Sequence, residues 1–173
     1  MSHGENGPGD VGQRVREQEA SCSIMGVVNL IWGDLPDLSI SNYQKECVKI
    51  IESLCRDADV LYTHGEHDTH QDHRAVASCT LGAARKNQRI LFYESPSAYN
   101  FNPNVYVDIS TPYDTNSTCL DVKLEALHCH ASQVLASDKV SPDHVRGNAL
   151  HRGREALTMA AEGFVPHRFV LEI

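Results

Sequence analysis

The sequence has no pair of cysteines at Cys-x-x-Cys spacing, no basic run longer than two residues and no apolar stretch much longer than a strand. The six scattered cysteines therefore indicate neither a zinc ribbon nor a redox motif, and we expect them to be reduced. With 15 Lys and Arg against 23 Asp and Glu, the formal charge of −8 argues against nucleic acid and anionic membranes as partners. A membrane helix needs about 20 apolar residues. The sequence predicts a cytoplasmic protein without a membrane span.

Apolar residues make up 41% of the 173 residues, which is enough for one globular domain over residues 1–173. Short apolar runs alternate with helical periodicities along the chain. We expect strands at 27–32, 59–63, 89–94, 105–109 and 169–171, and helices at 13–25, 41–56, 73–86, 120–130 and 142–164. This order predicts an α/β domain with a mostly parallel sheet and helices on both faces. In such sheets functional groups gather after the carboxyl ends of strands, here in loops 33–37 and 64–73.

The loop from His64 to His73 holds four of the ten histidines and three carboxylates. Histidines at every third residue do not share one side of a helix, so a four-histidine metal centre needs a specially folded loop. The segment from His70 to His73 offers a simpler site, with a metal ligand, an orienting carboxylate and an acid/base group. Alternatively, these are solvated loop residues, and Asp72 caps the following helix. Spacing alone leaves both interpretations open.

Further motifs occur in order around this loop. They are Ser2–Gly7, Arg14-x-x-Glu17, Met25–Val27, Leu35–Asp37, Asp59–Thr63, His70-x-Asp72-His73, Phe92–Glu94, Val107–Ile109, Lys123-x-x-Ala126-x-x-x-His130-x-Ser132-Gln133 and Ala161–Phe164. Together they resemble the PIG-L/LmbE family of zinc-dependent N-deacetylases over essentially the whole chain.

The resemblance implies a Rossmann-like three-layer αβα fold and hydrolysis of the acetamide of an amino sugar or a related glycoside. It makes His73 a zinc ligand, His70 the electrostatic and acid/base partner of the tetrahedral intermediate, and Asp72 the carboxylate behind the ligand. Arg14 and Asp37 would contact substrate hydroxyls. The expected partner is a small N-acetylated sugar, and its identity stays open among hexosamine glycosides, nucleotide sugars and sugar-linked thiol precursors.

One departure from the family pattern affects the metal site. Family members begin with a strand that ends in His-Pro-Asp-Asp-Glu, which provides two zinc ligands and the general base, and no such motif occurs here. The resemblance thus describes an N-terminally truncated domain without the first strand, a helix and most of the second strand. Its zinc site is incomplete, so we expect the 173-residue chain to be inactive.

Three interpretations of this departure remain open. The sequence is a fragment or has a misplaced start, which the retained histidine motif favours. Alternatively, the chain is a shortened, catalytically dead paralogue that binds a carbohydrate or a protein. Finally, the site is completed locally by His3, His64 or His67, or by another chain. Because loss of a central strand would open a sheet edge, it would also favour a homo-oligomer.

Overall fold

The computed structural model describes residues 1–84 and 89–170, which pack as two compact units. The first unit consists of Met1–Ser2, Gly33–Val105 and Gly163–Ile173, and the second of His3–Trp32 and Tyr106–Glu162. Each unit is assembled from separated stretches of chain, so the units are not consecutive domains. The prediction of one domain over residues 1–173 stays a prediction.

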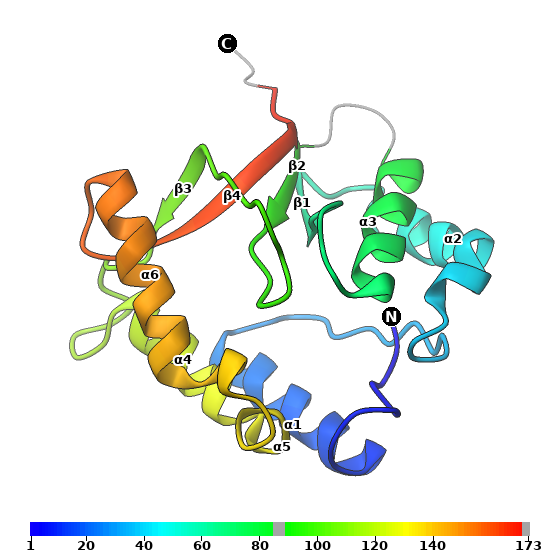
Figure 1. The fold of residues 1–173 in the computed structure, drawn as a ribbon, viewed down its shortest axis with the longest axis horizontal. Coiled ribbons are helices and arrows are strands. Elements are labelled where there is room, and N and C mark those ends of the chain that lie inside the picture. Colours follow the sequence, from blue (N-terminus) through cyan, green and yellow to red (C-terminus); the bar gives the residue numbers. More distant parts are fainter. Residues whose placement is uncertain (85–88, 171–173) are drawn as a thin grey trace. The chain divides into compact units, whose positions relative to one another are not determined.

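The first unit carries most of a four-stranded sheet with the order β1-β2-β4-β3. Its strands are β1 (Val60–His64), β2 (Arg89–Tyr93), β3 (Val105–Asp108) and β4 (Ala161–Arg168), of which β3 and β4 continue into the second unit. Strand β1 is parallel to β2, whereas β4 is antiparallel to β2, and the three lie side by side in Figure 1. The predicted α/β class is confirmed, with a mixed sheet.

Two helices build the main core of the first unit. A short 3-10 helix, η1 (Ile40–Tyr43), leads into α2 (Gln44–Leu54), which packs against α3 (Gln71–Ala83). Cys47 and Ile51 are four residues apart, so they share the face of α2 that is buried in this core. The helices predicted at 41–56 and 73–86 are thereby confirmed, with α3 ending at Ala83; Arg85 and Lys86 lie outside the described residues.

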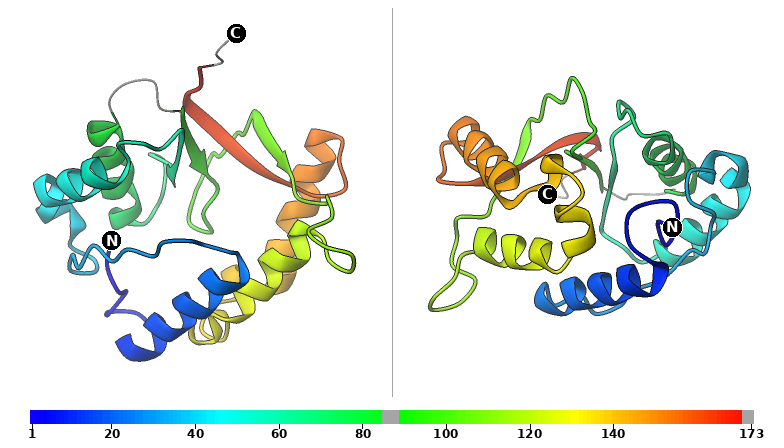
Figure 2. Two further views of the ribbon diagram at one scale, coloured as in Figure 1. Left: turned by 180° about the vertical axis from the view of Figure 1, so that it is seen from behind. Right: turned by 60° about the horizontal axis from the view of Figure 1, so that its bottom comes forward.

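The second unit is largely helical. It contains α1 (Val11–Ile24), α4 (Cys119–His128), α5 (Ala131–Val134), η2 (Asp138–Val140) and α6 (Pro142–Ala156). Side chains cap three of these helices, because Asp10, Thr118 and Ser141 accept hydrogen bonds from backbone N–H groups of the first turns of α1, α4 and α6. Helices α4 and α6 lie side by side in Figures 1 and 2 and share a core around Leu120 and Ala149.

Three of the predicted elements differ from the structure. Residues 27–32 form no strand, and Val28 is 90% exposed, because no neighbouring strand pairs with this segment among the described residues. The helix predicted to reach residue 164 ends at Ala156, where Leu157 adopts the left-handed conformation. Residues 161–168 instead pair with β2 as β4. Consequently residues 169–170 are not a strand, and Leu171 lies outside the described residues.

Candidate active site

The histidine-rich loop follows β1 directly and leads into α3, at the edge of the sheet where the sequence predicts a site. A pocket of about 460 Å³ opens here within the first unit. This volume falls in the usual range for small-molecule sites. The polar residues lining the pocket are Ser2, Asp37, Tyr62, Thr63, His64, His70, Asp72, His73, Thr80 and Tyr93.

Asp68 contacts the lining residue His73 and is only 1% exposed. Its carboxylate accepts hydrogen bonds from the backbone N–H of His70 at 2.7 Å, from the hydroxyl of Ser95, and from His73 Nδ1 at 2.9 Å. Burial by itself would raise the pKa of Asp68, but hydrogen bonds from Ser95, the His70 backbone, Ser97 and His73 hold that pKa well below its usual range. Asp68 is therefore a fully buried, ionised hydrogen-bond acceptor.

The ring of His64 packs against the ring of His73. The two rings stack with centroids 3.7 Å apart and planes 9° apart. His64 Nε2 lies 2.9 Å from the hydroxyl of Tyr93, while His64 Nδ1 is buried without a hydrogen-bond partner among the described residues. Burial first, and then the neighbouring His73, lower the pKa of His64 to about 4. His64 is therefore a neutral imidazole near pH 7.

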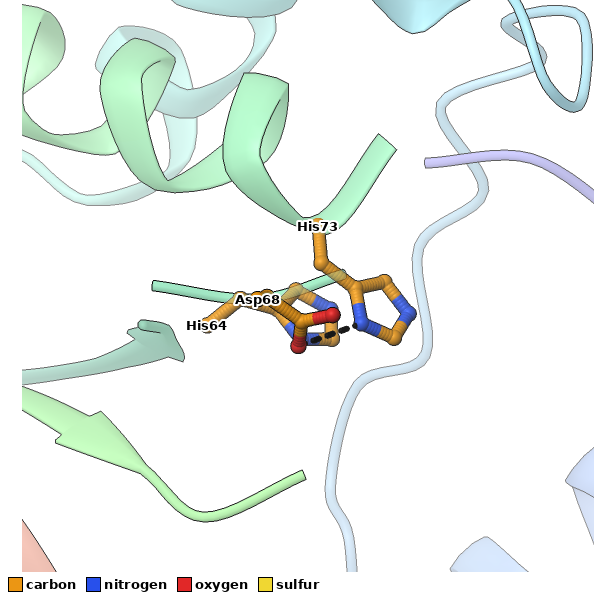
Figure 3. Close-up of side chains that lie close together, drawn as sticks. All are labelled: His64, Asp68 and His73. Carbon is orange, nitrogen blue, oxygen red and sulfur yellow. Dashed lines mark hydrogen bonds and ion pairs between the residues drawn. The ribbon is translucent and has the colours of Figure 1, made fainter. Parts of the chain in front are cut away.

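His64, Asp68 and His73 form a group with the donor types that zinc prefers, and one donor atom of each lies within 4.8 Å of the others (Figure 3). Ring orientation limits what the group can hold. An imidazole lone pair lies in the ring plane, and two stacked planes 9° apart do not meet within a metal–nitrogen bond of about 2.0–2.1 Å. The chemistry thus fits a metal ion, but His64 and His73 can bind the same ion only if one ring turns.

His70 occupies the N-cap of α3 and also lines the pocket. Its Nδ1 accepts a hydrogen bond from the backbone N–H of Asp72 at 3.2 Å, and its ring stacks on His73 with centroids 4.4 Å apart. Since Nδ1 acts as an acceptor, the proton of the neutral ring is on Nε2. His70 can therefore donate a hydrogen bond to a group in the pocket.

Asp72 and Asp37 are connected through the backbone of the turn after Pro36. The carboxylate of Asp72 is 4% exposed and accepts hydrogen bonds from Leu38 N at 2.6 Å and Ile40 N at 3.2 Å. Asp37 precedes these two groups and accepts a hydrogen bond from the hydroxyl of Ser2 at 3.3 Å. Asp72 thereby fixes the turn that carries Asp37 at the pocket.

Arg14 lies in the second unit, on α1. Its guanidinium donates to the carbonyl oxygen of Pro8 at 2.9 Å and to that of Gly4. On the next turn of α1, Glu17 accepts hydrogen bonds from the backbone N–H of Ser132 at 3.0 Å and from its hydroxyl at 2.6 Å. Arg14 and Glu17 thus both have defined partners within the second unit.

The structure brings four of the five predicted site residues, Asp37, His70, Asp72 and His73, to one pocket. Sequence reasoning missed Asp68, Tyr93 and Ser95. One local signal pointed to Asp68, because an Asp side chain commonly accepts from the backbone two residues ahead, as it does here from His70. Tyr93 falls within the Phe92–Glu94 motif, but no local pattern links Tyr93 or Ser95 to the loop, because their contacts with it span 27 residues or more of sequence.

Comparison with known proteins gives a consistent result. Residues 1–84 match the family model described as PIG-L, GlcNAc-PI de-N-acetylase. The chain is 29% identical over 140 residues to the uncharacterized deacetylase YaiS of Escherichia coli K12, a match that covers 76% of this chain and 72% of YaiS.

Two solved structures share the fold. The conserved protein TT1542 from Thermus thermophilus superposes with a TM-score of 0.80 at 22% identity, over 98% of this chain and 80% of that protein. The N,N'-diacetylchitobiose deacetylase from Pyrococcus horikoshii superposes with a TM-score of 0.70 at 19% identity, over 90% of this chain and 63% of that enzyme. These comparisons confirm the resemblance read from the sequence: the chain is similar to deacetylases of the PIG-L/LmbE type, and it shares the α/β fold of the two solved structures.

Proposed function

We propose that this chain acts on the N-acetyl group of an amino sugar or a related glycoside, as a zinc-dependent hydrolase of the PIG-L type. The observation that carries the proposal is the convergence of His70, His73 and Asp37 on one pocket of the first unit. The similarity to a chitobiose deacetylase supports an N-acetylated sugar as substrate.

His73 is the residue we propose to hold the zinc ion. Zinc at this place would supply a Lewis acid that polarises the acetamide carbonyl. His70 stands beside His73 with its protonated Nε2 available, so it can donate a hydrogen bond to the oxygen on which negative charge develops. As an imidazolium, the same side chain can pass a proton to the departing amine and return to the neutral ring.

Asp37 and Arg14 are the proposed contacts to substrate hydroxyls. The carboxylate of Asp37 can accept hydrogen bonds from a sugar, and the turn that carries it is fixed by Asp72. The guanidinium of Arg14 has donors beyond those it uses on Pro8 and Gly4. We propose that Asp72 holds the histidine-rich loop next to the turn at Leu38 and Ile40.

We further propose that the 173 residues alone bind zinc weakly and turn over slowly or not at all. The sequence has no His-Pro-Asp-Asp-Glu motif, and Asp68, the carboxylate that contacts His73, is already engaged by several donors. A cytoplasmic setting fits the six cysteines, all of which are free. We also propose that the chain self-associates into a homo-oligomer.

Binding and turnover should be measured on the same samples. The chain is titrated with N-acetylglucosamine and N,N'-diacetylchitobiose, with zinc and with EDTA, while chemical shifts report binding and an amine-reactive dye reports deacetylation. We expect sugar binding that zinc strengthens and that His73→Gln abolishes. His151→Gln, which changes an exposed histidine of α6, is the matched control.

The outcomes separate the proposals. Sugar binding that is insensitive to EDTA and to His73→Gln would instead support a carbohydrate-binding module. Rapid amine release by the wild-type chain would overturn the proposal of inactivity, and would confirm the hydrolase if His70→Gln removed it. No binding of either sugar in the presence of zinc would overturn the proposed substrate class.

A further inference from the structure

Asp68 is the most deeply buried carboxylate of the histidine-rich loop, and the proposed reaction gives it no direct task. Its side chain is completely excluded from solvent, whereas the side chain of His73 is 27% exposed. The two are joined by a 2.9 Å contact between Asp68 Oδ2 and His73 Nδ1 (Figure 3). A buried ionised carboxylate has to be satisfied by donors, so the donors around Asp68 show what it does.

Both oxygens of Asp68 are occupied in a defined way. Oδ1 accepts from the backbone N–H of His70, which fixes the loop at the start of α3. Oδ2 accepts from the hydroxyl of Ser95, which follows β2. His73 Nδ1 also contacts Oδ2, and Ser97 contributes a further hydrogen bond to the carboxylate. Three donors outside the His73 ring therefore hold Asp68 in place, so the carboxylate can orient that ring.

The direction of the Asp68–His73 hydrogen bond follows from chemistry. Both oxygens of Asp68 already accept hydrogen bonds, from the His70 backbone and from Ser95, so Asp68 is also the acceptor in its contact with His73 and the proton is on Nδ1. In the neutral imidazole the lone pair is then on Nε2, and this nitrogen points away from Asp68 (Figure 3). Stacking against His64 on one side and His70 on the other restricts rotation of the ring.

We propose that Asp68 is the positioning residue of the site, which holds His73 in the Nδ1-protonated tautomer so that Nε2 is presented to a divalent cation. The inference rests on the proposed function in giving His73 the metal. It assigns the orienting role to Asp68, while Asp72 is engaged by the backbone of Leu38 and Ile40. A carboxylate that accepts the second N–H of a histidine ligand is a common device in zinc sites.

The tautomer is measured directly by two-bond ¹H–¹⁵N correlation spectra of the metal-free chain, in which a protonated and an unprotonated ring nitrogen resonate far apart. The signals of His73 are identified by their loss in His73→Gln. We expect protonated Nδ1 and unprotonated Nε2 in the wild-type chain. A wild-type His73 protonated on Nε2 would overturn the proposal without any variant, so the test does not depend on how the variants fold.

Asp68→Asn tests the cause. The side-chain amide of Asn has the size of the carboxylate but only one acceptor oxygen. Its NH₂ group must therefore take the place of one carboxylate oxygen, next to either the N–H of His70 or Nδ1 of His73. We expect the population of Nε2-protonated His73 to rise. Ser95→Ala leaves the carboxylate in place and should retain the wild-type tautomer, and Glu66→Gln, an exposed change in the same loop, should have no effect.

Zinc binding is then measured with the metal alone, by competition with a fluorescent chelator. Loss of an orienting partner typically weakens metal binding 10–100-fold, and we expect a change of about this size for Asp68→Asn. An unchanged tautomer in folded Asp68→Asn, or a switched tautomer with unchanged zinc affinity, would overturn the proposal. Neither measurement uses a sugar or turnover, so an absence of deacetylation would count against the proposed function only.

Discussion

Replacing Asp72 with alanine is expected to destabilise the chain strongly, because this carboxylate satisfies two backbone N–H groups at 2.6 Å and 3.2 Å. A hydrogen bond to a charged group contributes about 1.5–3 kcal/mol, so losing both lowers the free energy of unfolding by about 3–6 kcal/mol. Asp72 also lies in the first turn of α3, where a negative charge contributes a further 0.3–1 kcal/mol or so. Asp72→Asn keeps one acceptor and should cost about half as much.

The assay is urea unfolding followed by circular dichroism. With a denaturant dependence of about 2 kcal/mol per molar urea, Asp72→Ala should lower the midpoint by about 1.5–3 M. Glu66→Ala removes an exposed carboxylate of the same loop and should leave the midpoint within about 0.3 M, because exposed substitutions rarely exceed 0.5 kcal/mol. An Asp72→Ala midpoint equal to that of Glu66→Ala would refute the reasoning that Asp72 holds the turn at Leu38 and Ile40.

Three further changes probe the rest of the chain. Burial lowers the pKa of His130 below its unfolded value of about 6.5, so the free energy of unfolding should fall as the pH drops from about 7.5 to about 5.5. Urea unfolding at these two pH values should show a smaller fall for His130→Asn than for the wild-type chain. Burial raises the pKa of the Cys47 thiol to about 12, so mass spectrometry should find Cys47 unlabelled by iodoacetamide in the native protein, while the half-buried Cys129 is labelled. Ile90 is fully buried in β2, and Ile90→Ala should lower the free energy of unfolding by about 2–5 kcal/mol in calorimetry.

The part of the site that the sequence could predict is the part that is local in the chain. His70, Asp72 and His73 fall within one helical turn at the start of α3, so their spacing alone brings them together. The alternative that Asp72 only caps a helix is partly correct, because its carboxylate does accept hydrogen bonds from backbone N–H groups. Those groups are 32 and 34 residues away, in the turn at Leu38 and Ile40 instead of in α3, and no local pattern encodes that distance.

The wrong secondary-structure predictions have one physical origin. An apolar run indicates that a segment can be buried, but a strand also needs a neighbouring strand to hydrogen-bond its backbone groups. Residues 161–168 find that partner in β2, although the sequence pattern continues the period of α6. Residues 27–32 have the stronger apolar run and no strand beside them among the described residues, so their side chains are largely exposed.

His70 and His73 show how identical side chains obtain opposite chemical properties in one pocket. His70 accepts a backbone N–H at Nδ1, which leaves its proton on Nε2 and makes it a hydrogen-bond donor toward the pocket. His73 donates from Nδ1 to Asp68, which leaves a lone pair on Nε2 that can bind a metal ion. The reaction proposed above uses both a hydrogen-bond donor and a metal ligand beside the acetamide. The difference between the two histidines comes from their partners, the backbone N–H of Asp72 for His70 and the buried carboxylate of Asp68 for His73. The position of each histidine in the loop therefore sets its tautomer.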